Sequence, residues 1–239
     1  MKSHVETLPL YLQVADRLEN TIARSATGTE LPSEHTLAHT YRVSRLTARA
    51  ALEELERRYL VRRSQGRRTR VARRVDYVIG PHWPASWSES VRLGGANPRS
   101  ITERLQLRRP PAAIRATLGL GTEDALHLKR SRYVDDELAA IADTWLNPRL
   151  VPMLAERLSA DGSLYRTFND VYRLDPRRKS ARAEFVVAPA AVARRLGQEG
   201  RPIVVKLTGC TAASNGNVIE CTTSWLRADV FNVVFELLP

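Results

Sequence analysis

The sequence predicts an α+β protein of two domains, a small helical N-terminal domain and a larger domain with an antiparallel sheet. Helical periodicity followed by a short hairpin fills residues 1–72, whereas strands and helices interleave over 86–239. The charge is divided in the same way: residues 42–74 contain twelve arginines and three glutamates, and residues 75–239 contain 22 basic and 18 acidic residues. Localised positive charge is typical of a domain that binds a phosphate backbone, although a solvated arginine-rich surface is the alternative.

Three helices are predicted at the start of the chain. Apolar residues recur at spacings of three and four over 9–24, after Ser33, and over 45–58. Ser33 and Ser44 directly precede the second and third helices, where a hydroxyl can cap free backbone N–H groups. The side of the third helix away from its apolar residues carries Arg45 and Arg49, with Thr47 nearby. Two helices joined by a tight turn, the second beginning with Arg and Thr, form a helix-turn-helix layout.

A basic hairpin is predicted after the third helix. Residues 59–63 and 67–71 are typical of two short strands, and Gly66 in the turn between them can take a positive φ. A hairpin beside a recognition helix is a wing, which reaches phosphates or the minor groove. The wing arginines Arg67 and Arg68 are therefore candidate phosphate contacts.

The rest of the chain reads as a linker over 73–85 and a second domain over 86–239. Gly80-Pro81 and Trp83-Pro84 interrupt the periodicity of the linker. Helices are expected over 88–93, 111–119, 163–172 and 189–196, and strands over 126–134, 139–147, 182–187, 203–212 and 218–227. The Asn215-Gly216 turn joins the last two strands as a hairpin.

Composition and motifs argue against several classes of protein. No apolar run approaches the roughly 18 residues of a membrane span, and the N-terminus has no apolar signal segment, so we expect a cytoplasmic protein without membrane contact. The sequence has no nucleotide-binding glycine loop, nucleophile elbow or metal-ligand cluster. We therefore expect no enzyme activity, no cofactor and no metal. His35 and His39 have a metal-compatible spacing, but without a third ligand a surface or phosphate-facing pair is favoured.

The two cysteines of the chain are expected to face each other. A two-residue turn at Asn215-Gly216 places Cys210 opposite Cys221. Opposed strand residues have Cβ atoms about 4.5–5.5 Å apart, wider than the roughly 3.8 Å of a disulfide. We therefore expect neighbouring reduced thiols, with redox sensing as the less favoured alternative.

Two arginines continue an otherwise apolar strand face. Alternation over 126–134 places Leu126, Leu128, Arg130 and Arg132 on one side. Arginines on a core-facing side either pair with a carboxylate on a neighbouring strand or bind an anionic ligand. Spacing alone favours the structural pairing.

The N-terminal pattern resembles the winged-helix domain of GntR-family bacterial transcription regulators. The matching residues are Pro9-Leu10-Tyr11, Leu31-Pro32-Ser33-Glu34, Leu37-Ala38, Val43-Ser44-Arg45, Thr47, Arg49, Ala51-Leu52, Leu55, Arg62-Arg63 and Gly66. The resemblance implies that Arg45, Arg49 and Gly66 contact operator DNA, with Thr47 beside them. The chain departs from the family pattern at His35, where Arg is usual, and at Arg68, where a second wing glycine is usual.

The larger domain resembles the ligand-sensing UTRA domain of HutC-type GntR regulators, which has a chorismate-lyase-like fold. The matching residues are Ser88-Glu89, Gly94, Leu118-Gly119-Leu120, Arg130-Ser131-Arg132, Ser163-Leu164-Tyr165, Leu196-Gly197, Arg201-Pro202, Ile219-Glu220 and Arg227-Ala228-Asp229. The resemblance implies that this domain forms the dimer and binds a small effector. It favours Arg130, Arg132, Ser163 and Tyr165 as effector ligands. Ser88 is a further candidate, and Glu220 either accepts from the ligand or pairs with one of the arginines.

Together these features predict a sequence-specific regulator that binds double-stranded DNA as a homodimer. The resemblance implies a repressor released from a palindromic operator by a small anionic metabolite. An enzyme of chorismate-lyase-like fold and a nonspecific nucleoid-type DNA binder are the alternatives, and a single palindromic footprint or substrate turnover separates the three.

Overall fold

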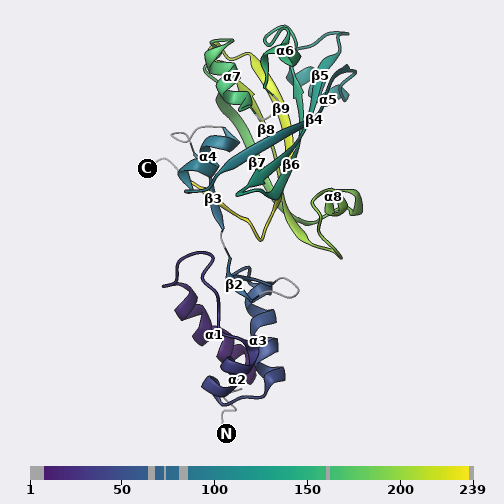
Figure 1. The fold of residues 1–239 in the computed structure, drawn as a ribbon. Coiled ribbons are helices and arrows are strands. Elements are labelled where there is room, and N and C mark those ends of the chain that lie inside the picture. The colour runs from purple at the N-terminus through teal and green to yellow at the C-terminus, as the bar shows by residue number, and fades with distance from the viewer. Residues whose placement is uncertain (1–7, 64–67, 73, 81–85, 160–161, 237–239) are drawn as a thin grey trace, which may run out of the picture. The chain divides into compact units, whose positions relative to one another are not determined.

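The computed structural model describes residues 8–63, 68–72, 74–80, 86–159 and 162–236 (Figure 1). These residues form two compact units, Met1–Arg74 and Val75–Pro239. Each unit has its own apolar core. No helix among the described residues is long and apolar enough to cross a membrane.

The first unit is the expected three-helix domain with a short hairpin. It contains α1 (Leu10–Ile22), α2 (Glu34–Tyr41), α3 (Arg45–Arg57), β1 (Val61–Arg62) and β2 (Arg70–Val71). The two strands pair antiparallel. Apolar residues at helical spacing, among them Leu18, Leu37 and Leu52, are buried together between the helices. The predicted helix-turn-helix layout with a hairpin is confirmed.

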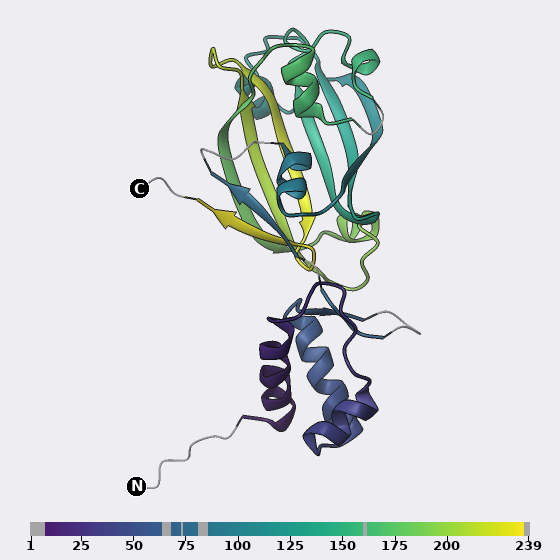
Figure 2. The same ribbon diagram turned by 60° about the vertical axis from the view of Figure 1, so that its left-hand side comes forward.

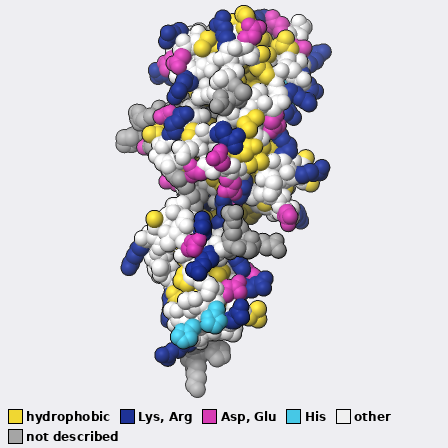
Figure 3. Space-filling view, viewed as in Figure 1, with side chains coloured by type: hydrophobic (Ala, Val, Ile, Leu, Met, Phe, Trp, Pro, Cys, Tyr) yellow, Lys and Arg dark blue, Asp and Glu magenta, His cyan; other side chains and the backbone are white. Residues whose placement is uncertain are grey.

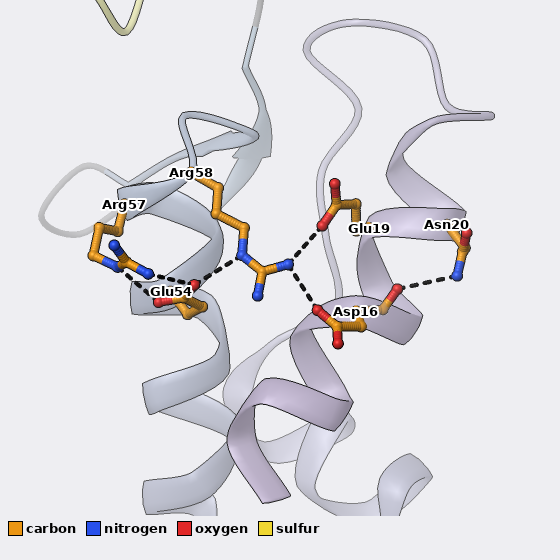
Figure 4. A network of polar contacts seen from close by, with 6 residues as sticks. All are labelled: Asp16, Glu19, Asn20, Glu54, Arg57 and Arg58. Atoms are coloured by element: carbon orange, nitrogen blue, oxygen red, sulfur yellow. Dashed lines mark hydrogen bonds and ion pairs between the residues drawn. The ribbon is translucent and has the colours of Figure 1, made fainter. Parts of the chain in front are cut away.

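An ion-pair network joins the ends of α1 and α3 (Figure 4). Arg58 donates to Glu54 at 2.8 Å on its own helix and to Asp16 and Glu19 of α1, both at 2.7 Å. Arg57 donates to the same Glu54 carboxylate, which is 7% exposed. Hydrogen bonds from Arg57 and Arg58 lower the pKa of Glu54 to about 2. The network therefore joins the two longest helices of the unit, and Glu54 is ionised at neutral pH.

We expect Glu54 to make the stability of this unit acid-sensitive. Its pKa falls on folding, so its contribution is complete above the ordinary value of 4.5 and is lost as the pH falls towards about 2. Glu54→Gln should therefore cost about 1–2 kcal/mol at pH 7, and this cost should vanish near pH 2. Urea unfolding of the full chain across this pH range measures the difference. Glu53→Gln, which changes a half-exposed carboxylate on the same helix, should cost less; an equal, pH-independent cost would contradict the account.

The second unit is built on a six-stranded antiparallel sheet in the order β4-β5-β6-β9-β8-β7. The strands are β4 (Pro98–Arg108), β5 (Ala125–Val134), β6 (Glu137–Leu146), β7 (Arg177–Val187), β8 (Ile203–Ala212) and β9 (Val218–Arg227). A separate parallel pair joins β3 (Val75–Ile79) to β10 (Phe231–Phe235). The predicted α+β domain with an antiparallel sheet is confirmed.

Short helices cover both faces of the sheet. They are α4 (Trp87–Leu93), α5 (Ala112–Thr117), α6 (Leu154–Arg157), α7 (Leu164–Asp170) and α8 (Ala190–Arg195). On one face, α4 and the β3–β10 pair pack in one apolar cluster, and α6 and α7 pack in another (Figure 2). We call this the inner face. Separate clusters form around α5 and α8.

Three sequence expectations differ from the structure of this unit. The segment 73–85 was expected to be a linker, yet it contains β3, whose parallel partner β10 is more than 150 residues away and invisible to local pattern. Strand β7 begins at residue 177 instead of 182, because its first half is polar and does not alternate. Strand β4 was not expected, since it lies at the sheet edge with exposed residues on both faces.

The expectation of reduced cysteines was wrong. Cys210 and Cys221 are directly opposite in β8 and β9, as predicted, but they are joined by a disulfide. Their Cα atoms are 4.2 Å apart, the spacing of the narrow pairs of an antiparallel ladder, in which side chains approach more closely. The average Cβ spacing used for the sequence prediction does not apply to such a pair.

Candidate functional site

Serine caps position the two helices of the helix-turn-helix. The Ser33 hydroxyl accepts from the Thr36 backbone N–H at 3.1 Å, and the Ser44 hydroxyl accepts from the Thr47 N–H at 3.0 Å. Between the helices, Arg42 takes a left-handed conformation with φ 53°. These local interactions fix the point at which the chain enters α3. Ser33 and Ser44 thus have a structural role whatever else they contact.

The start of α3 is open to solvent. Arg45 and Arg49 are exposed, and the Thr47 hydroxyl is held by Ser44 at 2.8 Å. Arg49 is paired with Glu53 at 2.9 Å, an exposed pair that DNA phosphates can replace. Leu46, which the sequence analysis did not select, is 77% exposed. An apolar side chain at this position can contact a thymine methyl group.

Of the four remaining candidates for DNA contacts, His35 and Arg68 are among the described residues. His35 at the start of α2 is exposed. Figure 3 shows histidine side chains (cyan) at the surface with basic side chains (dark blue) close by. Arg68 is exposed, and its Nε lies 3.8 Å from a Glu30 carboxylate oxygen. Gly66 and Arg67 lie outside the described residues. No group of three His, Cys, Asp or Glu suited to a metal occurs among the residues that were described.

In the second unit, β5 carries two buried arginines into the inner face. Arg130 is 3% exposed and Arg132 is 9% exposed. An Arg130 Nη donates to the Gly162 backbone oxygen just before α7, and Arg132 donates to the Ser224 hydroxyl at 3.4 Å and lies over the Trp87 ring at 5.5 Å. Within the described chain, neither arginine has a carboxylate within 4.0 Å, and the Nε of each is buried without a hydrogen-bond partner. The structural pairing favoured by spacing alone is therefore not present in this structure.

The buried carboxylate nearby has other partners. Glu220, 3% exposed, accepts hydrogen bonds from the Tyr165 hydroxyl at 2.6 Å and the Thr211 hydroxyl at 3.4 Å. A further hydrogen bond of 2.6 Å joins Tyr165 to Thr211. Tyr165 comes from α7, and the other two come from facing positions of β8 and β9. The triad fixes the Glu220 oxygens beside the arginines without neutralising either one.

Burial sets the protonation preferences of these groups. It lowers the pKa of Arg132, and burial with Arg132 close by lowers the pKa of Arg130 to about 9. Burial also raises the pKa of Glu220, although the Tyr165 hydrogen bond and Arg132 oppose this. With a pKa of about 9, Arg130 remains protonated at neutral pH. Positive charge at this buried position is costly, and a bound anion would offset that cost.

Two cavities meet at Tyr165. The inner cavity, of about 30 Å³, is lined by Arg132, Tyr165 and Glu220 among others, which is room for a water or two. The outer cavity, of about 320 Å³, is more open and includes Ser163, Tyr165 and Arg166. Arg132 and Glu220 thus line the inner cavity, Ser163 lines the outer one, and Tyr165 lines both, with Arg130 on the same strand as Arg132.

Ser88 does not belong to this region, and its neighbour Ser86 does. Ser86 is the N-cap of α4, accepts from the Glu89 N–H at 3.3 Å and lines the outer cavity. Ser86 was not predicted, because Ser88, two residues further along the chain, was expected at the start of this helix. It also missed Arg178, Tyr77 and Trp87, which line the inner cavity from β7, β3 and the start of α4. Arg178 donates to the Tyr77 hydroxyl at 3.4 Å.

Comparison with known families assigns both units. Residues 10–71 match the model for bacterial regulatory proteins of the gntR family, and residues 94–232 match the UTRA domain model. The chain belongs to the GntR family. Its UTRA domain is the larger unit that contains the buried arginines, and its GntR domain contains the helix-turn-helix.

Curated GntR relatives span almost the whole chain. The HTH-type transcriptional regulator GgaR of Escherichia coli is 26% identical over 235 residues, 97% of this chain and 92% of that protein. The mannosyl-D-glycerate transport/metabolism system repressor MngR of Escherichia coli is 31% identical over 172 residues, 70% of each. Among solved structures, PhnF from Mycobacterium smegmatis matches with a TM-score of 0.66 at 23% identity, covering 94% of this chain and 99% of that one. The chain is thus a DNA-binding transcription regulator with a UTRA domain.

Proposed function

We propose that this GntR regulator is a cytoplasmic, homodimeric repressor without enzymatic activity. Helix α3 of each copy binds one half of a pseudo-palindromic operator, since a two-fold dimer requires two-fold related half-sites. A small metabolite carrying a phosphate, phosphonate or carboxylate enters the UTRA domain and releases the DNA.

The exposed start of α3 supports the DNA-binding part of the proposal. Arg45 and Arg49 are exposed, one helical turn apart, and not buried against the domain core. Guanidinium groups at the start of a recognition helix bind guanine edges bidentately. Ser33, His35 and Ser44 at the starts of the two helices, with Thr47, fit contacts that set orientation on the phosphate backbone. The wing residues Gly66, Arg67 and Arg68 are proposed to contact phosphate or the minor groove.

We expect Arg45→Ala to weaken binding to the specific operator by about 1–3 kcal/mol, because it removes a base contact. Arg68→Ala should instead weaken binding to all sequences alike and flatten the salt dependence, because it removes a phosphate contact. Fluorescence anisotropy with operator and random duplexes at several salt concentrations separates the two effects. Arg108→Ala, which removes an exposed arginine of the UTRA domain, is the control for net charge. Wild-type operator affinity in the Arg45 variant would contradict the assignment of α3.

The excess of buried positive charge is the observation that carries the effector proposal. Arg130 and Arg132 are buried on the inner face, and among the described residues that line the inner cavity Glu220 is the one buried carboxylate. Two buried guanidinium Nε atoms, of Arg130 and Arg132, have hydrogen-bonding capacity that the described chain does not use. Guanidinium pairs of this kind bind phosphate or carboxylate with directed hydrogen bonds.

The outer cavity supplies the polar groups expected for the rest of the ligand. The hydroxyls of Ser86 and Ser163 accept from backbone N–H groups, so their own protons remain available for donation to an anion. The volume of the outer cavity, about 320 Å³, is at the lower end of the usual range for small-molecule sites. The repressor MngR is named for a system that handles mannosyl-D-glycerate, which is a carboxylate, and this supports the same ligand class.

A thermal-shift screen of phosphorylated and carboxylated metabolites tests the effector proposal. A ligand that binds only the folded state raises the apparent stability, by about 2.7 kcal/mol at a hundred times its Kd. We expect at least one anionic compound to raise the melting temperature, and its uncharged analogue to have no effect. Stabilisation by uncharged compounds alone would contradict the anion site.

Strand β3 provides a route from the pocket towards the DNA-binding domain. It begins at Val75, directly after the last residue of the first unit, and Tyr77 within it lines the inner cavity and contacts Arg178. An effector that draws Arg178 towards itself changes this contact in the strand nearest to the domain boundary. A ligand shifts a conformational equilibrium only through such differential contacts.

A further inference from the structure

The two cysteines of the chain lie beside the proposed effector site. Cys210 of β8 and Cys221 of β9 are directly opposite and joined by a disulfide. Both cysteines pack in the cluster that contains Leu118 and Leu120, where Cys221 is 2% exposed and Cys210 is partly exposed. Cys210 is also among the residues that line the inner cavity. The pair thus has one partly exposed and one buried cysteine.

The next residue pair along the same strands is part of the site itself. Thr211 and Glu220 are opposite each other, one step from the cysteines in the register of β8 and β9. Both form hydrogen bonds with the Tyr165 hydroxyl. On the other side of β8, the Cys210 backbone N–H donates to the Ser180 hydroxyl at 3.3 Å, and Ser180 also lines the inner cavity. A covalent link at Cys210 therefore fixes the strands that position the carboxylate of the site.

We propose that Cys210 and Cys221 form a reversible oxidation site whose state sets the affinity of the inner cavity for anions. This inference rests on the proposed function, because it concerns the same anion site. The disulfide joins the two strands next to Glu220, so the oxidised form holds the cavity nearer to its binding geometry. Pre-organisation of this kind raises affinity by reducing the ordering cost of binding. The reduced form is expected to bind the same anion more weakly.

A hydroperoxide is the class of oxidant that completes the reaction. The Cys210 thiolate attacks the peroxide oxygen, which breaks the O–O bond and gives a sulfenic acid and, from hydrogen peroxide, one water. The Cys221 thiolate then attacks the Cys210 sulfur and displaces the hydroxyl as a second water. Two thiols and one hydrogen peroxide thus give one disulfide and two waters. A small thiol reverses the change by attacking the sulfur of Cys210, the less buried of the two residues, with Cys221 as the leaving thiolate, and a second thiol releases the resulting mixed disulfide.

The proposed cytoplasmic location gives this pair a regulatory meaning. Disulfides in that compartment are usually transient and redox-sensing, because cellular thiols keep cysteines reduced. An intramolecular pair with one partly exposed cysteine can change state while the protein stays folded. The regulator would then combine two signals, the concentration of an anionic metabolite and the presence of peroxide.

Inorganic phosphate binding to the full-length chain tests the proposal. Isothermal titration is carried out on protein oxidised with hydrogen peroxide and on protein reduced with a dithiol, with thiol alkylation and intact mass confirming each state. We expect phosphate to bind the oxidised form at least about fivefold more tightly, the lower end of ordinary coupling factors. The Cys210→Ala, Cys221→Ala double variant keeps the site but lacks the bond. It should bind phosphate like the reduced wild type and ignore both reagents.

Phosphate binding and disulfide formation must affect each other equally, so the midpoint potential of the disulfide gives a second, independent measurement. If oxidation tightens phosphate binding fivefold, saturating phosphate must favour the disulfide by the same factor. For a two-electron couple this makes the midpoint potential more negative by about 20 mV, measured by alkylation across a series of glutathione redox buffers.

The outcomes separate this inference from the proposed function. Equal phosphate affinity in the two forms, with the potential unchanged by phosphate, would overturn the redox inference and leave the anion site intact. Absence of phosphate binding in both forms would overturn the redox inference and the anion site together. A redox response that persists in the double alanine variant would also reject the role of the pair.

Discussion

Replacing Arg132 with alanine is expected to abolish release of DNA by the effector while leaving operator affinity of the ligand-free protein nearly unchanged. Arg132 is buried on the inner face with no carboxylate within 4.0 Å among the described residues. Its removal therefore takes away a binding group for the anion, while the nearby Glu220 carboxylate keeps its hydrogen bonds to Tyr165 and Thr211. Loss of the charge-assisted hydrogen bonds should raise the effector Kd at least tenfold, which corresponds to about 1.4 kcal/mol.

A volume-matched variant separates the charge of Arg132 from its packing. Arg132→Met keeps most of the side-chain volume against Trp87 and removes the guanidinium. We expect both variants to lose the response to effector and the methionine variant to melt close to the wild type. Anisotropy measurements of effector-induced DNA release, with melting curves on the same samples, check this. A strongly destabilised methionine variant would show that Arg132 has a structural role, and a stable one that still releases DNA would remove Arg132 from the site.

Gly209→Ala is expected to destabilise the UTRA domain by about 2–3 kcal/mol, at the high end of the usual cost of overpacking. A Cβ at this position of β8 would lie 2.4 Å from the Ser180 backbone oxygen of β7. Since backbone cannot rotate away as a side chain can, the edge strand must move. Arg178 and Ser180 would move with it, so anion affinity should fall together with stability.

Urea unfolding of the full chain measures the cost of Gly209→Ala. Gly121→Ala is the matched control, since its Cβ would meet no atom within 4 Å and the backbone there does not require glycine. The control should change the free energy of unfolding by less than about 0.5 kcal/mol. Equal stability of the two variants would contradict the close approach of β7 and β8.

Local signals explain why the DNA-binding domain could be predicted from sequence. Its helices are amphipathic, and Ser33 and Ser44 cap them through hydrogen bonds to residues three positions further on. Such interactions depend on neighbours in the chain, so pattern reading captures them. Arg130 and Arg132 could also be selected, because strand alternation alone places them on the same side as Leu128.

The other half of the site depends on contacts between distant segments. Arg178 lies in the polar half of β7, and Tyr77 lies in a strand whose partner comes from the end of the chain. Arg178 follows no pattern that marks it as facing the cavity, and Tyr77 alternates with its neighbours in a strand of only five residues. Ser86 was missed by an error of two residues at a helix start, the usual size of such errors. Predicting the disulfide would have required the distance between Cys210 and Cys221, which the strand register alone does not provide.

One titration measures the proposed coupling between the anion site and DNA. An operator is first selected from random duplexes by the full-length protein, and the anionic metabolite that most raises its melting temperature is then added to the preformed complex. We expect a two-fold symmetric operator whose affinity falls by at least about fivefold at saturating metabolite, the lower end of ordinary coupling factors. An operator affinity that stays the same while the metabolite binds would contradict the account.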